Sequence, residues 1–168
     1  MTIVARRLGV LPAWAGSLLA ALGLLMVIAS FFLLPVDVVD CVDSCPQPKF
    51  YATAWEYSQT SLKDLPASLA FPNSLAFDVC FLVLAYLPLL AAVMVVVCSL
   101  GFLAWPQRAF ARWGHRAWLV GCIALVLFLL VDLYLASFFG GGPELGFWGL
   151  LFGYGLLWAG NRVALNSA

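Results

Sequence analysis

The short basic segment Trp105–Trp118, which reads WPQRAFARWGHRAW, is the polar interruption between two long apolar runs of the chain. Its residues Arg108, Arg112 and Arg116 would each cost roughly 2.5–3.5 kcal/mol at the middle of a bilayer on insertion scales. Such residues stay on the side from which a membrane protein inserts, so we expect this segment in the cytoplasm. These three topology-setting arginines therefore set the orientation in the membrane of the apolar runs before and after them.

The composition places the chain in a membrane. Hydrophobic residues make up 65% and charged residues 10% of its 168 residues, whereas soluble domains carry roughly 25% charged residues. A chain of this length has room for about four spans of ~20 residues and one sizeable loop. We therefore predict an all-α integral membrane protein, a four-transmembrane-helix bundle in a single membrane domain with a long structured first outer loop. The spans are predicted at 13–34, 76–104, 117–138 and 145–163, and the outer loop at 36–73.

The arginines and the acidic residues separate along the chain. The arginines fall in the N-terminus, the basic segment and the C-terminus, and the acidic residues fall in the other loops or near the opposite helix ends. This positive-inside pattern predicts a plasma-membrane or inner-membrane protein with both termini cytoplasmic and residues 36–73 outside. The basic residues are too few and too scattered for a nucleic-acid partner.

The outer loop begins with acidic residues around a close cysteine pair. Asp37, Asp40 and Asp43 recur at every third position and flank Cys41 and Cys45. Three residues between the cysteines allow a local disulfide in an oxidising compartment. A structural disulfide is the main interpretation, and a redox-active pair is the alternative. The aspartates do not have the spacing of a calcium loop, so no metal site is predicted and they indicate an acidic outer face.

An amphipathic segment at 50–65 follows the cysteine pair. One helical face of it gathers Tyr51, Trp55, Ser58, Leu62 and Leu65. A segment with Trp and Tyr on its apolar face suits the membrane interface. It is equally well explained as a loop helix that packs over the outer ends of the spans.

Two carboxylates fall in or near the predicted spans. Asp132 lies in the outer half of the third span, and Asp78 near the outer start of the second lies at a similar depth. Two neighbouring carboxylates form a possible intramembrane ion or proton site. The alternative is that Asp132 accepts hydrogen bonds from Tyr134, Tyr86 or the loop backbone. Pro88 should kink the second span.

The fourth span carries a stripe of glycines that indicates close contact with another helix. The helix-packing residues are Gly146, Gly149, Gly153 and Gly160. The partner helix belongs either to the same bundle or to another subunit. Gly16, Ala20 and Gly23 give the first span a similar series of small residues.

Two families are similar in arrangement. Cysteines just outside the first of four spans resemble those of membrane thiol oxidases of the disulfide-bond-forming type B family, but this chain lacks a second outer pair. The long first outer loop with a close cysteine pair resembles that of claudin-like tetraspan proteins, but here Trp55 follows the pair. No cofactor is predicted, because the single histidine, His115, lies in the basic segment with no second histidine to bind haem.

No nucleotide-binding or hydrolase motif occurs in the sequence. We therefore expect a non-catalytic four-helix membrane subunit that packs in and stabilises a larger membrane protein assembly, with the outer loop as its contact surface. Its partners would be the lipid bilayer and other membrane subunits. One alternative is a small transporter or proton-linked carrier that uses Asp132 and Asp78. Another is an outer-face thiol oxidoreductase that uses Cys41 and Cys45.

Overall fold

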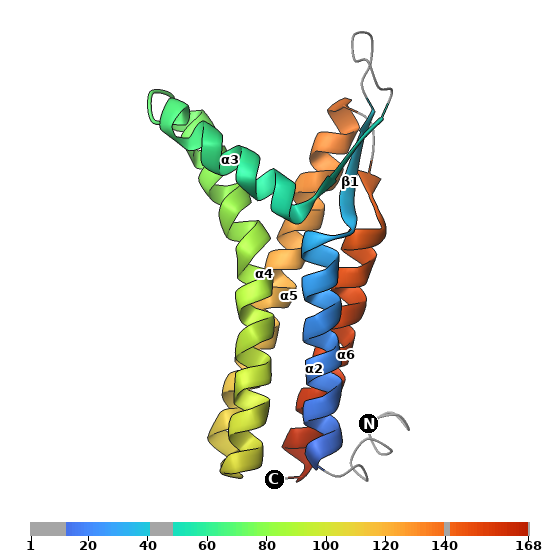
Figure 1. Cartoon of the computed structure of the whole chain (residues 1–168). Helices are drawn as coiled ribbons and strands as arrows, with labels where there is room; N and C mark the ends of the chain where they lie inside the picture. The colour runs from blue at the N-terminus through green and yellow to red at the C-terminus, as the bar shows by residue number, and fades with distance from the viewer. Residues whose placement is uncertain (1–12, 41–48, 140–141, 168) are drawn as a thin grey trace.

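A computed structural model describes residues 13–40, 49–139 and 142–167 of the chain. Its main elements are helices, four of which run side by side while α3 crosses one end (Figure 1). The five helices are α2 (Ala13–Phe32), α3 (Ala54–Ser68), α4 (Pro72–Ala104), α5 (Arg108–Phe139) and α6 (Leu145–Ser167).

Three of these helices are long and apolar enough to cross a membrane. They are α2, α4 and α5, over Trp14–Phe32, Asp78–Ala104 and Arg108–Tyr134. The structure therefore confirms a mainly helical protein with three helices that could cross a membrane. Large apolar side chains stay exposed along these helices, as the lipid-facing side of a membrane bundle requires.

Helix α6 covers the predicted fourth span, 145–163, but it is not among the helices whose length and apolar character make them candidate spans. Five glycines, two tryptophans and Tyr154 replace much of the Leu and Val that fill α4 and α5, and Asn161 and Arg162 follow near its end. The structure thus supports three candidate spans, and the count of four stays a prediction.

A small sheet at the end of the bundle was not predicted. Strands β1 (Pro35–Asp40), β2 (Lys49–Thr53) and β3 (Gly142–Pro143) are antiparallel, in the order β2-β1-β3. Val38 pairs with Tyr51 on one side and with Gly142 on the other. The third strand ties the connection between α5 and α6 to the segment that follows α2. Part of the predicted structured outer loop is therefore extended, as its β-branched and aromatic content favours.

Helix α3 begins later than the predicted amphipathic segment, because β2 occupies its first residues. Thr53 caps the helix: its hydroxyl accepts from the backbone of Glu56, and the Glu56 carboxylate accepts from the backbone of Thr53 at 2.8 Å. This capping box fixes the start of the helix. Ser58 is fully buried whereas Leu62 is 43% exposed, so α3 turns its serines toward the bundle and not the whole predicted apolar face.

The basic segment 105–118 is mostly helical and not a turn. Helix α5 already starts at Arg108, and only Trp105, Pro106 and Gln107 connect it to α4. Pro106 cannot continue α4, and its fixed backbone suits so short a connection. The three arginines therefore stand on the first turns of α5.

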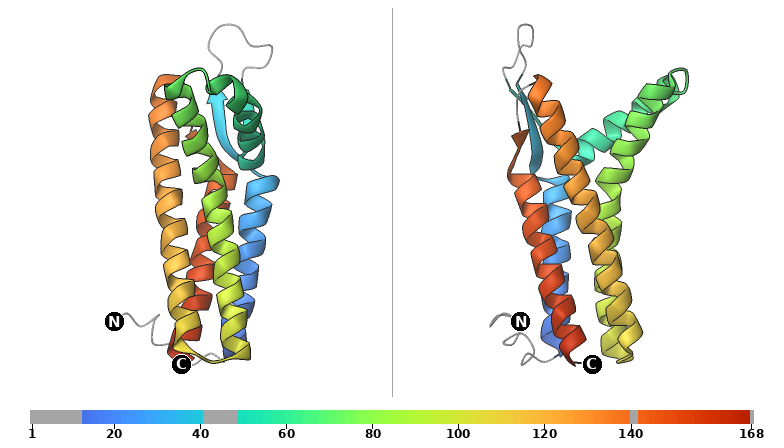
Figure 2. Two further views of the ribbon diagram at one scale, coloured as in Figure 1. Left: turned by 90° about the vertical axis from the view of Figure 1, so that its left-hand side faces the viewer. Right: turned by 180° about the vertical axis from the view of Figure 1, so that it is seen from behind.

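The helices pack most extensively in two pairs, α2 with α6 and α4 with α5. At the end where α2 begins and α6 ends, the two pairs lie close together. Toward the other end α4 leans away from α5 and α2, and α3 accompanies it, so that the bundle opens like a V (Figures 1 and 2). Helix α4 runs from residue 72 to 104, so Pro88 is its middle residue. We call α3 and the half of α4 before Pro88 the α3–α4 arm.

Candidate functional site where the helix arm leaves the bundle

A polar contact joins α2 to α4 in the closed half of the bundle, which is the half where the two helix pairs lie close together. The hydroxyl oxygens of Ser17 on α2 and Ser99 on α4 lie 3.0 Å apart and are hydrogen-bonded. Both side chains are buried, which strengthens such a bond because water does not compete for it.

A second set of contacts joins three helices at the middle of the bundle. The Trp118 indole Nε1 on α5 donates to the backbone carbonyl of Tyr154 on α6 at 3.0 Å. The Tyr154 hydroxyl donates in turn to the backbone carbonyl of Pro88 on α4 at 2.5 Å. Gly121 on α5 leaves the space that the Tyr154 ring fills, since a Cβ there would collide with it. The α3–α4 arm leaves the bundle at this point.

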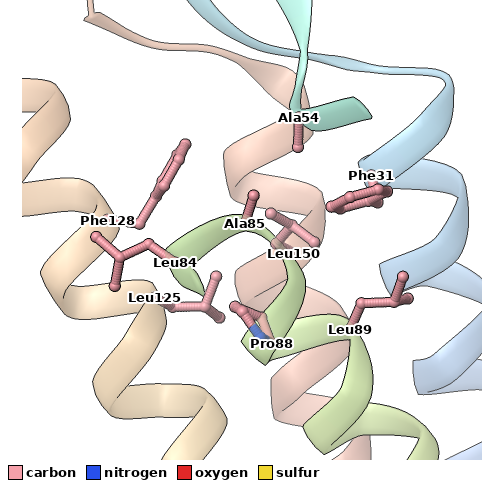
Figure 3. A pocket seen from close by; sticks show the side chains of 9 residues that line it. All are labelled: Phe31, Ala54, Leu84, Ala85, Pro88, Leu89, Leu125, Phe128 and Leu150. Atoms are coloured by element: carbon pink, nitrogen blue, oxygen red, sulfur yellow. The ribbon is translucent and has the colours of Figure 1, made fainter. Parts of the chain in front are cut away.

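An apolar hollow lies at this point, between all five helices (Figure 3). Its free volume is small, about 10 Å³, which is close to the room that a single water molecule needs. The lining residues are Phe31, Ala54, Leu84, Ala85, Pro88, Leu89, Leu125, Phe128 and Leu150. No charged or hydrogen-bonding side chain lines it, so the hollow offers no groups for acid–base or nucleophilic chemistry.

Two side-chain contacts make the α3–α4 arm a unit. Ser58 on α3 and Tyr86 on α4 share a hydrogen bond of 3.1 Å between their hydroxyl oxygens. Near the far end of the arm, the Ser68 hydroxyl donates to the carboxylate of Asp78. The arm therefore consists of two helices joined at both ends by polar groups.

The two carboxylates that the sequence singled out lie on different parts of the molecule. Asp78 is on the arm, where its described partner is Ser68. Asp132 is on α5, two turns before the helix ends at Phe139, and is 6% exposed. Tyr86, one of the donors considered for Asp132, forms its hydrogen bond with Ser58. Helices α4 and α5 pack together over much of their length but diverge toward the end of the bundle where α4 begins and α5 ends (Figures 1 and 2).

The cysteine pair Cys41 and Cys45 lies outside the described residues, so the disulfide and its redox-active alternative stay predictions. The described cysteines are free: Cys80 is exposed, Cys98 buried and Cys122 intermediate. Asp37 and Asp40 belong to β1, and Asp43 lies outside the described residues. Within residues 13–40, 49–139 and 142–167, no three His, Cys, Asp or Glu side chains gather as metal ligands would.

The glycine stripe of α6 lies against α2 of the same chain. A Cβ on Gly160 would stand 2.5 Å from the Gly16 carbonyl oxygen, and one on Gly153 would stand 2.9 Å from that of Gly23. Gly149 faces the hydroxyl of the buried Ser30, and a Cβ on Gly146 would stand 2.6 Å from the Leu34 carbonyl. The close backbone approach that these glycines permit is thus used within the bundle, and contact with other chains must use other surfaces.

Sequence reasoning missed the contact between Tyr154 and Pro88. One signal was available, because a tyrosine within an apolar run usually finds a hydrogen-bond partner. The partner itself was not readable, since any backbone carbonyl on a neighbouring helix could have accepted the bond. The hollow was equally out of reach, because its lining residues come from five helices that lie far apart in sequence.

Comparison of the chain with protein-family models, with curated proteins and with solved structures finds no match.

Proposed function

We propose that this protein is a non-catalytic four-helix membrane subunit that packs in and stabilises a larger membrane protein assembly. The observation that carries this proposal is the apolar hollow at the point where the α3–α4 arm leaves the bundle. Helices in lipid associate through close packing, because lipid tails are as apolar as the side chains. The apolar residues around the hollow are therefore better matched by the packed side chains of a partner helix than by mobile acyl chains.

The arm offers further contact surface beyond the hollow. Leu69 and Phe71, at the turn between α3 and α4, are 68% and 67% exposed, and Trp55 at the start of α3 is 37% exposed. A partner helix in the opening would meet these residues at its own end. In this proposal the outer segment 36–73 is the contact surface, α3 is its helical part, and the first half of α4 extends it.

The proposal includes a topology with α6 as the fourth span and both ends of the chain in the cytoplasm. Two features support it. The arginines of α5 and Arg162 lie at the end of the bundle where α2 begins and α6 ends, in line with the positive-inside rule (Figure 1). Exposed tryptophans occur near both ends of the helices, for example Trp14 at one end and Trp148 at the other, as in an aromatic belt.

Site-specific photocrosslinking tests the subunit role. A photoreactive residue in place of Cys80, which is exposed one turn before Leu84 of the hollow, should give a crosslinked product of one defined larger mass. The control position is Val97, which is 55% exposed on the closed half of the same helix and should give none. Mild detergent extraction should also retain the partner. A lone monodisperse monomer with no product from position 80 would contradict the proposal.

The second candidate function is a small transporter or proton-linked carrier, because Asp132 is buried within a candidate membrane span. An ionisable side chain there is costly and usually functional. If it moves an ion or a proton, Asp132→Asn should abolish uptake into proteoliposomes while the variant elutes like the wild type. Unchanged uptake would remove this candidate.

A further inference from the structure

A surface pocket on the first turns of α5 lies outside the contact surface described so far. The side chains of Ala109, Arg112, Trp113 and Arg116 line it. Both arginines are exposed and stand one helical turn apart. The Arg116 guanidinium lies over the Trp113 ring, 5.3 Å from its centre. This stacking orients one of two guanidinium groups that can reach a common ligand.

The pocket faces away from the bundle. Ala111, on the opposite side of the same turn, is 1% exposed, and a Cβ on Gly114 would stand 2.8 Å from the Asn161 side-chain oxygen of α6. The side of α5 that carries Ala111 and Gly114 therefore packs against the neighbouring helices. The arginine side is left free to meet the membrane surface.

The charge of the pocket calls for an anion from outside the molecule. The acidic residues of the described part of the chain lie in β1, in α3, in the first half of α4, near the end of α5 and directly before α6. These segments all lie toward the other end of the helices (Figure 1). Guanidinium groups bind phosphate with paired hydrogen bonds, which makes a phosphate the best-matched anion.

An apolar track continues from the pocket along the same face of α5. Val120, Ile123 and Leu127 are 45%, 60% and 46% exposed. They follow Arg116 at the spacing that keeps them on one side of the helix. A ligand with a phosphate at one end and a long apolar chain would contact the arginines and this track together.

We propose that the pocket binds the phosphate of an anionic phospholipid whose acyl chain lies along the apolar track. Basic pockets at the end of membrane helices attract such lipids, and tryptophan suits the headgroup level. The proposal does not depend on the subunit role, because it needs only that the first turns of α5 lie at the membrane surface. It gives Arg112 and Arg116 a binding role besides that of setting the topology.

Native mass spectrometry of the protein in mild detergent tests the proposal. We expect the wild type to retain phosphatidylglycerol in preference to phosphatidylcholine with the same acyl chains. The double variant R112Q/R116Q should lose this preference by roughly thirtyfold, at the usual contribution of an arginine near an anionic surface. The matched control is R162Q, because Arg162 also lies over a tryptophan, 5.6 Å from the Trp158 ring centre, without a second arginine one turn away.

A second variant and a soluble competitor keep the test decisive. If R112Q/R116Q does not fold, the single variant R116Q should still lose the preference by roughly fivefold. Glycerol phosphate should not displace the bound lipid, because it lacks the chain that contacts the track. An unchanged preference in the folded arginine variants, an equal loss in R162Q, or displacement by glycerol phosphate would each overturn the proposal.

Discussion

The Tyr154 hydroxyl of α6 donates a hydrogen bond to the backbone carbonyl of Pro88 on α4, with 2.5 Å between the two oxygens. Pro88 is the middle residue of α4, where the arm leaves the bundle. The bond therefore ties the arm-bearing helix to α6 near the point where the arm leaves the bundle. Beyond it lies the apolar hollow, lined in part by Leu84 and Phe128.

Replacement of Tyr154 by phenylalanine should loosen this connection. The ring stays and only the hydroxyl is lost, so we expect the free energy of unfolding to fall by about 1 kcal/mol, as for other hydrogen bonds between membrane helices. Unfolding in mixed detergent micelles measures the loss. A variant as stable as the wild type would mean that the bond contributes nothing.

Two glycines of α6 provide a matched pair for the contact with α2. Gly160→Ala would bring a Cβ to 2.5 Å from the Gly16 carbonyl oxygen and 2.8 Å from the Ala20 nitrogen. The backbone must move, which should cost roughly 1–3 kcal/mol. Gly155→Ala meets no atom within 4 Å and should be neutral or stabilise the helix by up to about 1 kcal/mol. If both variants melt alike, the close packing of α6 on α2 is wrong.

The hydrogen bond between Ser68 and Asp78 should hold the far end of α3 to α4. Ser68→Ala removes it, so amide hydrogen exchange within α3 should become faster. Thr60→Ala is the control, because the Thr60 hydroxyl donates within α3 to the Glu56 carbonyl at 3.1 Å and does not contact α4. Exchange that accelerates equally in both variants would show that the arm does not depend on the Ser68 contact.

The sequence predicted the helical core because long apolar runs allow few other structures in a membrane. The glycines at 16, 23, 153 and 160 also marked surfaces suited to close helix contact. The sequence could not indicate which helix they meet, and the structure places them against one another. This outcome weakens one argument for a partner, since the stripe is already occupied.

Other features could not be predicted from the sequence, because they depend on residues that are distant along the chain. Val38 pairs with Tyr51 and Gly142. No local sequence pattern indicates that the segment after α2 and the connection between α5 and α6 form one sheet. The aspartates at every third position predicted an acidic outer face. They did not indicate strand β1, in which two of them lie. Likewise, the similar depth of Asp78 and Asp132 said nothing about how far α4 leans from α5.

The sides of the membrane on which the two ends of the chain lie provide the most direct test of the four-span arrangement. Tags placed before Met1 and after Ala168 can be probed in intact cells with an antibody that does not cross the membrane. We predict that both tags are protected until the cells are permeabilised. An N-terminal tag that is protected together with a C-terminal tag that is reached from outside would require an odd number of spans and would contradict the account.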